Sequence, residues 1–333
     1  MSYYLKKLRR LSFGATSEGG SADGSSPRAS GAVPEPSGQL SPRSASAAFH
    51  RYWGISPSKE DSLLDELVAA LEARDASALR RLDRDALRRF LRSRNHDVAK
   101  AVEAVLSTLA WRDREGIDNI MDTFDFPERK QLFDMYPEGF FGTDAEGRPV
   151  YYQRPGGLDL KKLRKFTSLE RAVRYHLRKQ EWMLRDVLPA ASVAAGRRIH
   201  QNTLVIDLHG IGVTSLAGDV GKVVSEILRV DQDHYPELMA RCIVIRAPTS
   251  FKIIWKLVRP LLNPRTRDKV TLCSGKPREA LEAAGLPLEH VPALFKGDDP
   301  TDLMTEPGPW RDPEILKKVR AGEDKQLPDI VYA

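Results

Sequence analysis

Apolar residues recur at helical spacing between Ser58 and Gly116. A helix is expected to begin after Ser58, a candidate N-cap, because leucines follow it at intervals of three and four residues. Two more helices follow, the second running from about Asp97 towards Gly116. The apolar positions of the three helices are Leu63, Leu64, Leu67 and Leu71, then Leu87, Phe90 and Leu91, then Val98, Val102, Val105 and Leu109. The pattern predicts a small, entirely helical lobe.

From about residue 120 the pattern changes to short apolar runs separated by helical stretches. Strands are predicted at 148–153, 203–210, 240–248 and 269–274, and helices at about 167–187, 214–231 and 250–262. Segment 276–295 is interpreted as a helix, a turn at Gly285 and a closing PALF segment. Strands that alternate with helices favour an α/β fold with a largely parallel sheet and helices packed on it.

The segment 251–262, FKIIWKLVRPLL, is unusual for a surface helix. Its only charged residues, Lys252, Lys256 and Arg259, fall on one narrow stripe of a helix, and large apolar residues occupy most of the remaining circumference. A surface helix of a soluble protein normally has a limited apolar stripe and a wide polar face. The pattern therefore predicts apolar contacts on more than one side of this helix.

The first 48 residues differ in composition from the rest of the 333-residue chain. From Gly14 to Ala48 the chain is mainly Ser, Gly, Ala and Pro without an aromatic residue, so we expect disorder there. Residues 2–13 show a basic amphipathic pattern typical of a helix at a membrane interface, although a frayed terminus or a transit peptide would give a similar pattern. We find no apolar run long enough to span a bilayer and no signal-peptide core.

The net charge of +6 favours an acidic partner, either anionic lipid or nucleic acid. Nucleic acid is the weaker candidate, because no basic stripe is interleaved with aromatic residues and no zinc-finger or RNA-binding signature occurs. The two cysteines, Cys242 and Cys273, lie in apolar runs, so we expect buried reduced thiols of an intracellular protein.

Signatures of enzymatic chemistry are not found in the chain. The histidines lack metal-ligand spacing, and the sequence has no G-x-S-x-G elbow, no Walker A loop and no C-x₅-R loop. The GIG at 210–212 has no third glycine and is interpreted as a turn. Asp207 ends a predicted strand, where a hydrogen-bonding role is favoured over a catalytic one. We therefore predict no enzyme, no metal and no cofactor.

Several motifs in order carry a resemblance to a known family. They are LRRFLRSRNHDVAKAV, WR, YPEGFFGTDAEGRPVYY, VIDLHGI, DHYPELMARCIVIRAPTSF, LNPRTRDKV and EHVPALFKG. Between about Ser58 and Pro300 the chain resembles the CRAL-TRIO family, and within it the phosphatidylinositol/phosphatidylcholine transfer proteins. The resemblance implies a helical N-terminal lobe and a largely parallel sheet that floors a hydrophobic lipid pocket closed by a gate helix. We divide the chain into a tail (1–48), a helical lobe (49–119), a CRAL-TRIO domain (120–300) and a C-terminal extension (301–333).

The resemblance identifies residues 250–262 as the gate helix, which would close over the lipid and open at a membrane. Its apolar gate residues would be Phe251, Ile254, Trp255, Leu257, Val258 and Leu261. The phosphatidylinositol headgroup residues of the family correspond here to Arg94, Glu237, Thr266 and Lys269. Charged donors suit a phosphate, and a carboxylate accepts hydrogen bonds from inositol hydroxyls. Asn95 departs from the family, which often has a second cation there, and a plain Glu237–Lys269 salt bridge is the alternative.

The phosphatidylcholine site of the family is poorly matched. Its serine and threonine correspond to Asn202 and Leu204, and Leu204 cannot donate a hydrogen bond. Of the tyrosines only Tyr151 is retained, and Phe140 and Gln180 take two other positions. The second ligand therefore stays open between another phospholipid, a sterol and an isoprenoid-like molecule.

The resemblance implies a phosphatidylinositol-binding transfer protein that exchanges this lipid for a second one. We expect a monomer that works at the cytosolic surfaces of endomembranes such as Golgi or endoplasmic reticulum, without binding nucleic acid. One alternative is a sensor that presents phosphatidylinositol to a kinase without transferring it, and so couples a second ligand to phosphoinositide synthesis. The other is a hydrolase on an α/β scaffold, against which the missing nucleophile elbow argues.

Overall fold

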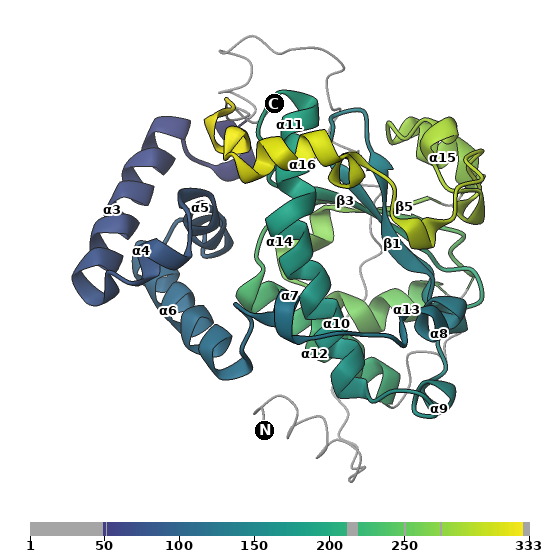
Figure 1. Cartoon of the computed structure of the whole chain (residues 1–333). Helices are drawn as coiled ribbons and strands as arrows, with labels where there is room; N and C mark the ends of the chain where they lie inside the picture. The colour runs from purple at the N-terminus through teal and green to yellow at the C-terminus, as the bar shows by residue number, and fades with distance from the viewer. Residues whose placement is uncertain (1–48, 51, 212–218, 250, 274, 329–333) are drawn as a thin grey trace.

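The computed structural model describes residues 49–50, 52–211, 219–249, 251–273 and 275–328, with the backbone alone described at 219, 220, 252, 254 and 257. The predicted tail and its N-terminal helix lie outside these residues. The first described helices form a lobe at one side of the molecule (Figure 1): α3 (Pro57–Asp75), α4 (Ala78–Arg81), α5 (Arg84–Ser93) and α6 (Val98–Glu115). Every apolar position predicted for this lobe lies in one hydrophobic cluster, with Leu63 and Val98 at its partly buried edge. The helical lobe is therefore confirmed.

The ends of these helices follow local capping chemistry. Asp97 caps α6 through a hydrogen bond from the Lys100 amide, and Gly116 ends the helix in the left-handed conformation that glycine adopts without strain. The predicted cap of α3 was wrong by two residues. The side chain of Ser56, not Ser58, accepts the Lys59 amide, because the helix starts at Pro57, two positions earlier than predicted.

Replacing Ser56 with Ala is expected to lower the free energy of unfolding by about 1 kcal/mol, because the Lys59 amide loses its acceptor. Urea denaturation followed by circular dichroism measures the change. Ser58→Ala is the matched control, since Ser58 bonds only the Ser56 hydroxyl in an exposed contact, and it should cost much less. Equal losses in the two variants would contradict the assignment of the cap.

The second lobe is built on a five-stranded sheet in the order β1-β2-β3-β4-β5. Its strands are β1 (Glu138–Thr143), β2 (Pro149–Gln153), β3 (Asn202–Asp207), β4 (Met239–Ile245) and β5 (Val270–Leu272). The pairs from β2 to β5 are parallel, and β1 pairs with β2 in the antiparallel sense. The four predicted strands and the largely parallel sheet are confirmed, whereas β1 was not predicted.

Helices surround this sheet, in part as predicted. They are α7 (Ile120–Thr123), α8 (Arg129–Met135), α9 (Leu160–Leu163), α10 (Leu169–Trp182), α11 (Leu188–Ala195), α12 (Asp219–His234), α13 (Phe251–Val258), α14 (Pro264–Asp268), α15 (Pro277–Ala283) and α16 (Pro313–Arg320). A π-helical turn, Met183–Val187, joins α10 to α11. The predicted helix 250–262 is shorter, because the α-helix ends at Val258 and a 3₁₀ turn, Arg259–Leu261, contains Pro260. Residues 214–218 of another predicted helix lie outside the described part.

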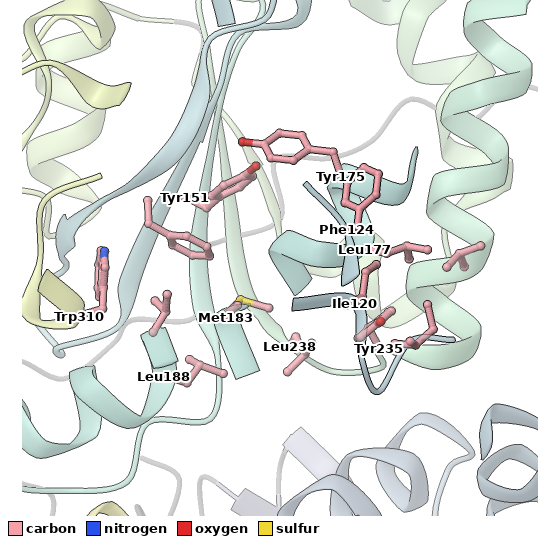
Figure 2. Packing of buried hydrophobic residues seen from close by; sticks show 14 of the residues in the cluster. Ile120, Phe124, Tyr151, Tyr175, Leu177, Met183, Leu188, Tyr235, Leu238 and Trp310 are labelled. Carbon is pink, nitrogen blue, oxygen red and sulfur yellow. The ribbon is translucent and has the colours of Figure 1, made fainter. Parts of the chain in front are cut away.

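The two faces of the sheet are covered to different degrees. On one face Tyr152, Thr203 and Val205 are fully buried, and the apolar residues there pack against α15 and the turns that follow it. On the other face Tyr151 pairs with Leu204 and Leu204 with Cys242, in register. Figure 2 shows this second side, with Tyr151 on its strand and a cluster that extends from Trp310 to Tyr235.

The C-terminal segment completes this second cluster. Trp310 is 2% exposed, and Ile315 and Val319 of α16 pack against the same residues. Figure 1 shows α16 lying across α11, which comes from the middle of the chain. The predicted extension is thus packed on the second lobe, while the domain boundaries themselves stay a prediction.

Candidate functional site

Glu237 and Lys269 form a buried ion pair where two parallel strands begin. Glu237 lies two residues before β4 and Lys269 directly before β5, and the Cys242 amide donates to the Lys269 carbonyl across these strands. Lys269 Nζ donates to Glu237 Oε2 at 2.7 Å and to the Met239 carbonyl at 2.9 Å, and the two side chains are only 9% and 7% exposed. Burying two charges costs desolvation free energy, and the attraction between them often does not repay that cost. A pair of this kind is therefore weak evidence for a purely structural role.

Thr266 and Arg94 lie at the junction between the helical lobe and this pair. Thr266 is in α14, one turn before Lys269, and its amide donates to the Asn263 side chain that caps the helix. Arg265 ties α14 to the lobe, because its guanidinium donates to the Arg92 carbonyl and lies over the Trp53 ring.

Arg94 follows α5 on the lobe side of this junction. It lines a surface groove of about 840 Å³ between α3 and α6. His234, three residues before Glu237, has its pKa lowered to about 3 by burial and by the charges of several arginines, Arg94 among them. The structure thus brings Glu237 and Lys269 into contact and places Thr266 one turn before Lys269, whereas Arg94 lines a groove of the helical lobe. Among the described contacts, none joins Arg94 directly to that pair.

The apolar face beside Lys269 is incompletely covered in the middle of the sheet. Leu204 and Ile206 are only partly buried, although they lie on the central strand, while Thr203 and Val205 on the opposite face are 0% exposed. A strand of a parallel sheet covered on both sides is normally buried on both faces. This face therefore has free apolar surface in the folded chain.

Helix α13 lies over this face and carries apolar residues on more than one side. Phe251 and Val258 pack towards the cluster of Leu208, Ile211, Cys242 and Val244. Trp255 stacks on Phe251 with ring centroids 6.0 Å apart. Ile253, in contrast, is 51% exposed, and Lys256 and Arg259 are exposed as well. Leu261 is partly buried in the 3₁₀ turn, and the side chains of Ile254 and Leu257 lie outside the described part.

The residues predicted for a second lipid occupy two separate places. Phe140 and Tyr151 pack together, with ring centroids 4.7 Å apart, beside Leu204 of the neighbouring strand. Gln180 instead donates to Asp231 of α12 at 3.1 Å. Asn202 is buried at the start of β3. The structure thus groups Phe140, Tyr151 and Leu204 and does not bring Gln180 to them through any described contact.

The polar partners of this region were not predicted from the sequence. Tyr151 donates its hydroxyl to Glu138 Oε2 at 2.6 Å, and burial together with this carboxylate raises the pKa of Tyr151 well above its ordinary value. Lys179 of α10 is also buried and donates to Glu306 at 2.7 Å. One sequence signal could have identified this site. Lys179 follows Tyr175 by four residues, on a stripe of the helix that is otherwise apolar or aromatic.

Asp207, the carboxylate at the end of β3, is held by two arginines and a backbone amide. Asp207 is fully buried, pairs with Arg154 at 2.8 Å and with Arg246, and accepts the His209 amide. Burial alone would raise the pKa of Asp207, but Arg246 and the amide outweigh it and hold the pKa below its ordinary value. Its predicted hydrogen-bonding role is confirmed.

The described residues contain no group of His, Cys, Asp or Glu side chains suited to a metal, and none of their helices has the length and hydropathy of a membrane span. Cys242 and Cys273 are free thiols, and burial raises the pKa of Cys242 to about 12. Cys242 is buried as predicted, whereas Cys273 is only partly buried.

Comparison with known proteins places the chain in a family. The CRAL/TRIO domain model matches residues 133–297. The phosphatidylinositol/phosphatidylcholine transfer proteins SFH7 and SFH9 of Arabidopsis thaliana are 35% and 34% identical over 71% and 81% of this chain, but the matches span only 44% and 47% of those proteins. The SEC14 cytosolic factor of Candida glabrata is 33% identical over 83% of this chain and 91% of its own length.

A solved structure supports the same architecture. The crystal structure of Sfh5 matches with a TM-score of 0.59 over 81% of this chain and 99% of that one, at 16% identity, and so shows the fold alone. The predicted CRAL-TRIO-like α/β fold is confirmed. The chain belongs to the CRAL/TRIO domain family, as a homologue of Sec14 and of the SFH phosphatidylinositol/phosphatidylcholine transfer proteins.

Proposed function

We propose that this protein binds phosphatidylinositol and exchanges it for a second lipid at membrane surfaces. The observation that carries the proposal is the buried Glu237–Lys269 pair next to an apolar sheet face that is only partly covered. Lys269 would bind the headgroup phosphate, Glu237 would accept hydrogen bonds from inositol hydroxyls, and Thr266 and Arg94 would complete the site. The acyl chains would lie over Leu204 and Ile206. The relatives named for phosphatidylinositol and phosphatidylcholine transfer support this assignment.

Helix α13 would act as the gate of this site. Two acyl chains carry roughly 30 methylenes, so exposing them to water costs on the order of 20 kcal/mol. A lipid therefore crosses water only when its chains stay covered, and a lid that opens at a membrane provides such a cover. Ile253 and Lys256 of α13 and Arg259 of the 3₁₀ turn after it are exposed, so an apolar side chain could enter the bilayer and the cations could meet lipid phosphates.

Phosphatidylcholine is a weaker candidate for the second lipid. Leu204 has no donor for a phosphate, and the Tyr151 hydroxyl already donates to Glu138. Another phospholipid, a sterol or an isoprenoid-like molecule fits the apolar surroundings equally well. The protein would act as a monomer without enzymatic activity, at cytosolic surfaces of Golgi or endoplasmic reticulum membranes, with the predicted N-terminal helix as an additional anchor.

A vesicle exchange assay tests this function. The purified full chain is expected to move labelled phosphatidylinositol from donor to acceptor vesicles, while labelled phosphatidylcholine moves more slowly. Native mass spectrometry of the same preparation should identify the second lipid. Tight binding of phosphatidylinositol without net exchange would support the presenter alternative instead, and failure to bind it in either assay would contradict both.

A further inference from the structure

A second, strongly basic pocket lies on the side of α10 that faces the C-terminal segment. It has a volume of about 320 Å³ and combines residues from α7, α8, α10, the π-helical turn and the C-terminal segment. The residues that line it are Met121, Arg129, Tyr175, Arg178, Lys179, Trp182, Arg185, Glu306 and Arg311. None of them belongs to the Glu237–Lys269 junction, so a ligand of this pocket is separate from phosphatidylinositol bound there.

The cationic residues of this pocket exceed its acidic ones. Five cationic side chains and one carboxylate, that of Glu306, line it, and Asp186 beside the pocket pairs with one of the five, Arg185, at 2.9 Å. Glu306 is 5% exposed and accepts from Lys179 at 2.7 Å and from Arg129 at 2.9 Å, and Arg311 lies 3.6 Å from it. Burial alone would lower the pKa of Lys179, but Glu306 outweighs it and holds this pKa above its ordinary value. Lys179 is therefore charged while only 8% exposed.

Two arginines that line the pocket, Arg178 and Arg129, also have a buried Nε without a hydrogen-bond partner among the described residues. A buried donor without an acceptor costs about 1–3 kcal/mol, and uncompensated charge at a partly enclosed site adds to that cost. These Nε atoms have almost no exposed surface, so an anion in the pocket would act by balancing the excess of positive charge that its lining carries.

We propose that this pocket binds a ligand through a phosphate group that carries two or more negative charges. Arginine guanidinium groups match phosphate oxygens in a bidentate arrangement, and four separate elements contribute one arginine each to the lining of this pocket. Lys179 Nζ lies 5.3 Å from the Tyr151 ring centroid, and the Phe140 amide donates to Glu306, so the pocket adjoins the residues predicted for the second lipid. The phosphate can belong to the headgroup of an anionic lipid or to a soluble phosphate ester.

The test compares a double variant with a matched control. Arg178→Gln with Arg311→Gln removes two cations of the pocket, and Lys317→Gln with Lys318→Gln removes two exposed cations of α16 outside it. Isothermal titration with inorganic pyrophosphate gives the affinity for a soluble anion. Sedimentation with phosphatidylcholine vesicles, with and without phosphatidic acid, gives the affinity for a lipid phosphate. We expect about a tenfold or greater loss of affinity in the pocket variant and less than twofold in the control.

The outcomes separate the two sources of phosphate. Loss in the titration alone supports a soluble ester, and loss in the vesicle assay alone supports a lipid headgroup. Wild-type affinity in the pocket variant, an equal loss in the control, or no binding by the wild-type chain overturns the proposal. Phosphatidylinositol exchange should stay within twofold of wild type in the pocket variant, so failure of this site is distinguishable from failure of the proposed function. If the double variant melts at a lower temperature than the wild-type protein, the single variant Arg185→Gln is used in its place, because the Arg185 side chain is 55% exposed. The same loss of affinity is expected for it.

Discussion

Replacing Ile253 with Asp is expected to slow phosphatidylinositol exchange between vesicles at least about tenfold while the protein stays folded. Ile253 is 51% exposed on α13, so a carboxylate there stays hydrated in the soluble protein. At a membrane the same carboxylate would have to enter an apolar boundary. An Asp at the centre of a membrane helix costs about 3 kcal/mol, and even half of that corresponds to roughly a tenfold effect.

Leu294→Asp is the matched control for the gate, because Leu294 is 38% exposed in the 3₁₀ turn Ala293–Phe295, which packs on the opposite face of the sheet. It should leave exchange near the wild-type rate. Trp255 provides a second readout, because its fluorescence should shift when vesicles are added. The contribution of Trp255 is the difference between the spectra of the wild-type protein and the Trp255→Phe variant. Removing the other tryptophans instead would disturb the core, where Trp111 and Trp310 are each 2% exposed. Normal exchange by Ile253→Asp, or unfolding of that variant, would contradict the gate.

Replacing Lys269 with Ala is expected to weaken phosphatidylinositol binding by about 1.5–3 kcal/mol, roughly 10- to 100-fold, because the phosphate loses a charged donor. The same change leaves Glu237 buried without its cation, so the free energy of unfolding should also fall, by about 3 kcal/mol. Loss of binding in this single variant would therefore mix a local effect on the headgroup with a general effect on stability.

A second variant separates the two effects. Glu237→Gln combined with Lys269→Met removes both charges, and its stability should recover most of what Lys269→Ala loses. Its affinity for phosphatidylinositol should stay low, because neither the donor nor the carboxylate is restored. Binding of the second lipid, measured by native mass spectrometry, should persist in it. Recovery of phosphatidylinositol binding along with stability would show that the pair serves the fold and not the headgroup.

The errors in the predicted elements have local causes. Strand β1, with the sequence EGFFGT, was missed because two glycines interrupt its apolar pattern, and Gly142 adopts a positive φ at an irregularity in the pairing. Its pairing with β2 supplies the order that its own sequence lacks. Helix α13 was predicted too long, because apolar residues continue past Pro260 although the proline prevents a further α-helical turn. In both cases the hydrophobic pattern alone was an incomplete guide.

The residues of the candidate site could be identified from the sequence, but most of their contacts with one another could not. The order of the motifs identified Glu237 and Lys269, and the parallel strands that follow them made an adjacent position plausible. Their direct contact, between residues 32 positions apart, is the salt bridge predicted from the sequence as an alternative, but the mutual arrangement of Thr266 and Arg94 could not be derived. Nothing in the pattern of residues connects Lys179 with Glu306, which are 127 residues apart.

Residue spacing along the chain was enough to predict the helical lobe, the succession of buried strands and the unusual apolar character of residues 251–262. These features depend on residue spacing within one element, which a single stretch of chain contains in full. Packing between distant segments, in contrast, leaves Leu204 and Ile206 partly uncovered, buries Trp310 in the core, and brings five cations and one carboxylate to the lining of one pocket. Burial and charge balance depend on which distant segments pack together, and a local pattern carries no information about the neighbour that covers it.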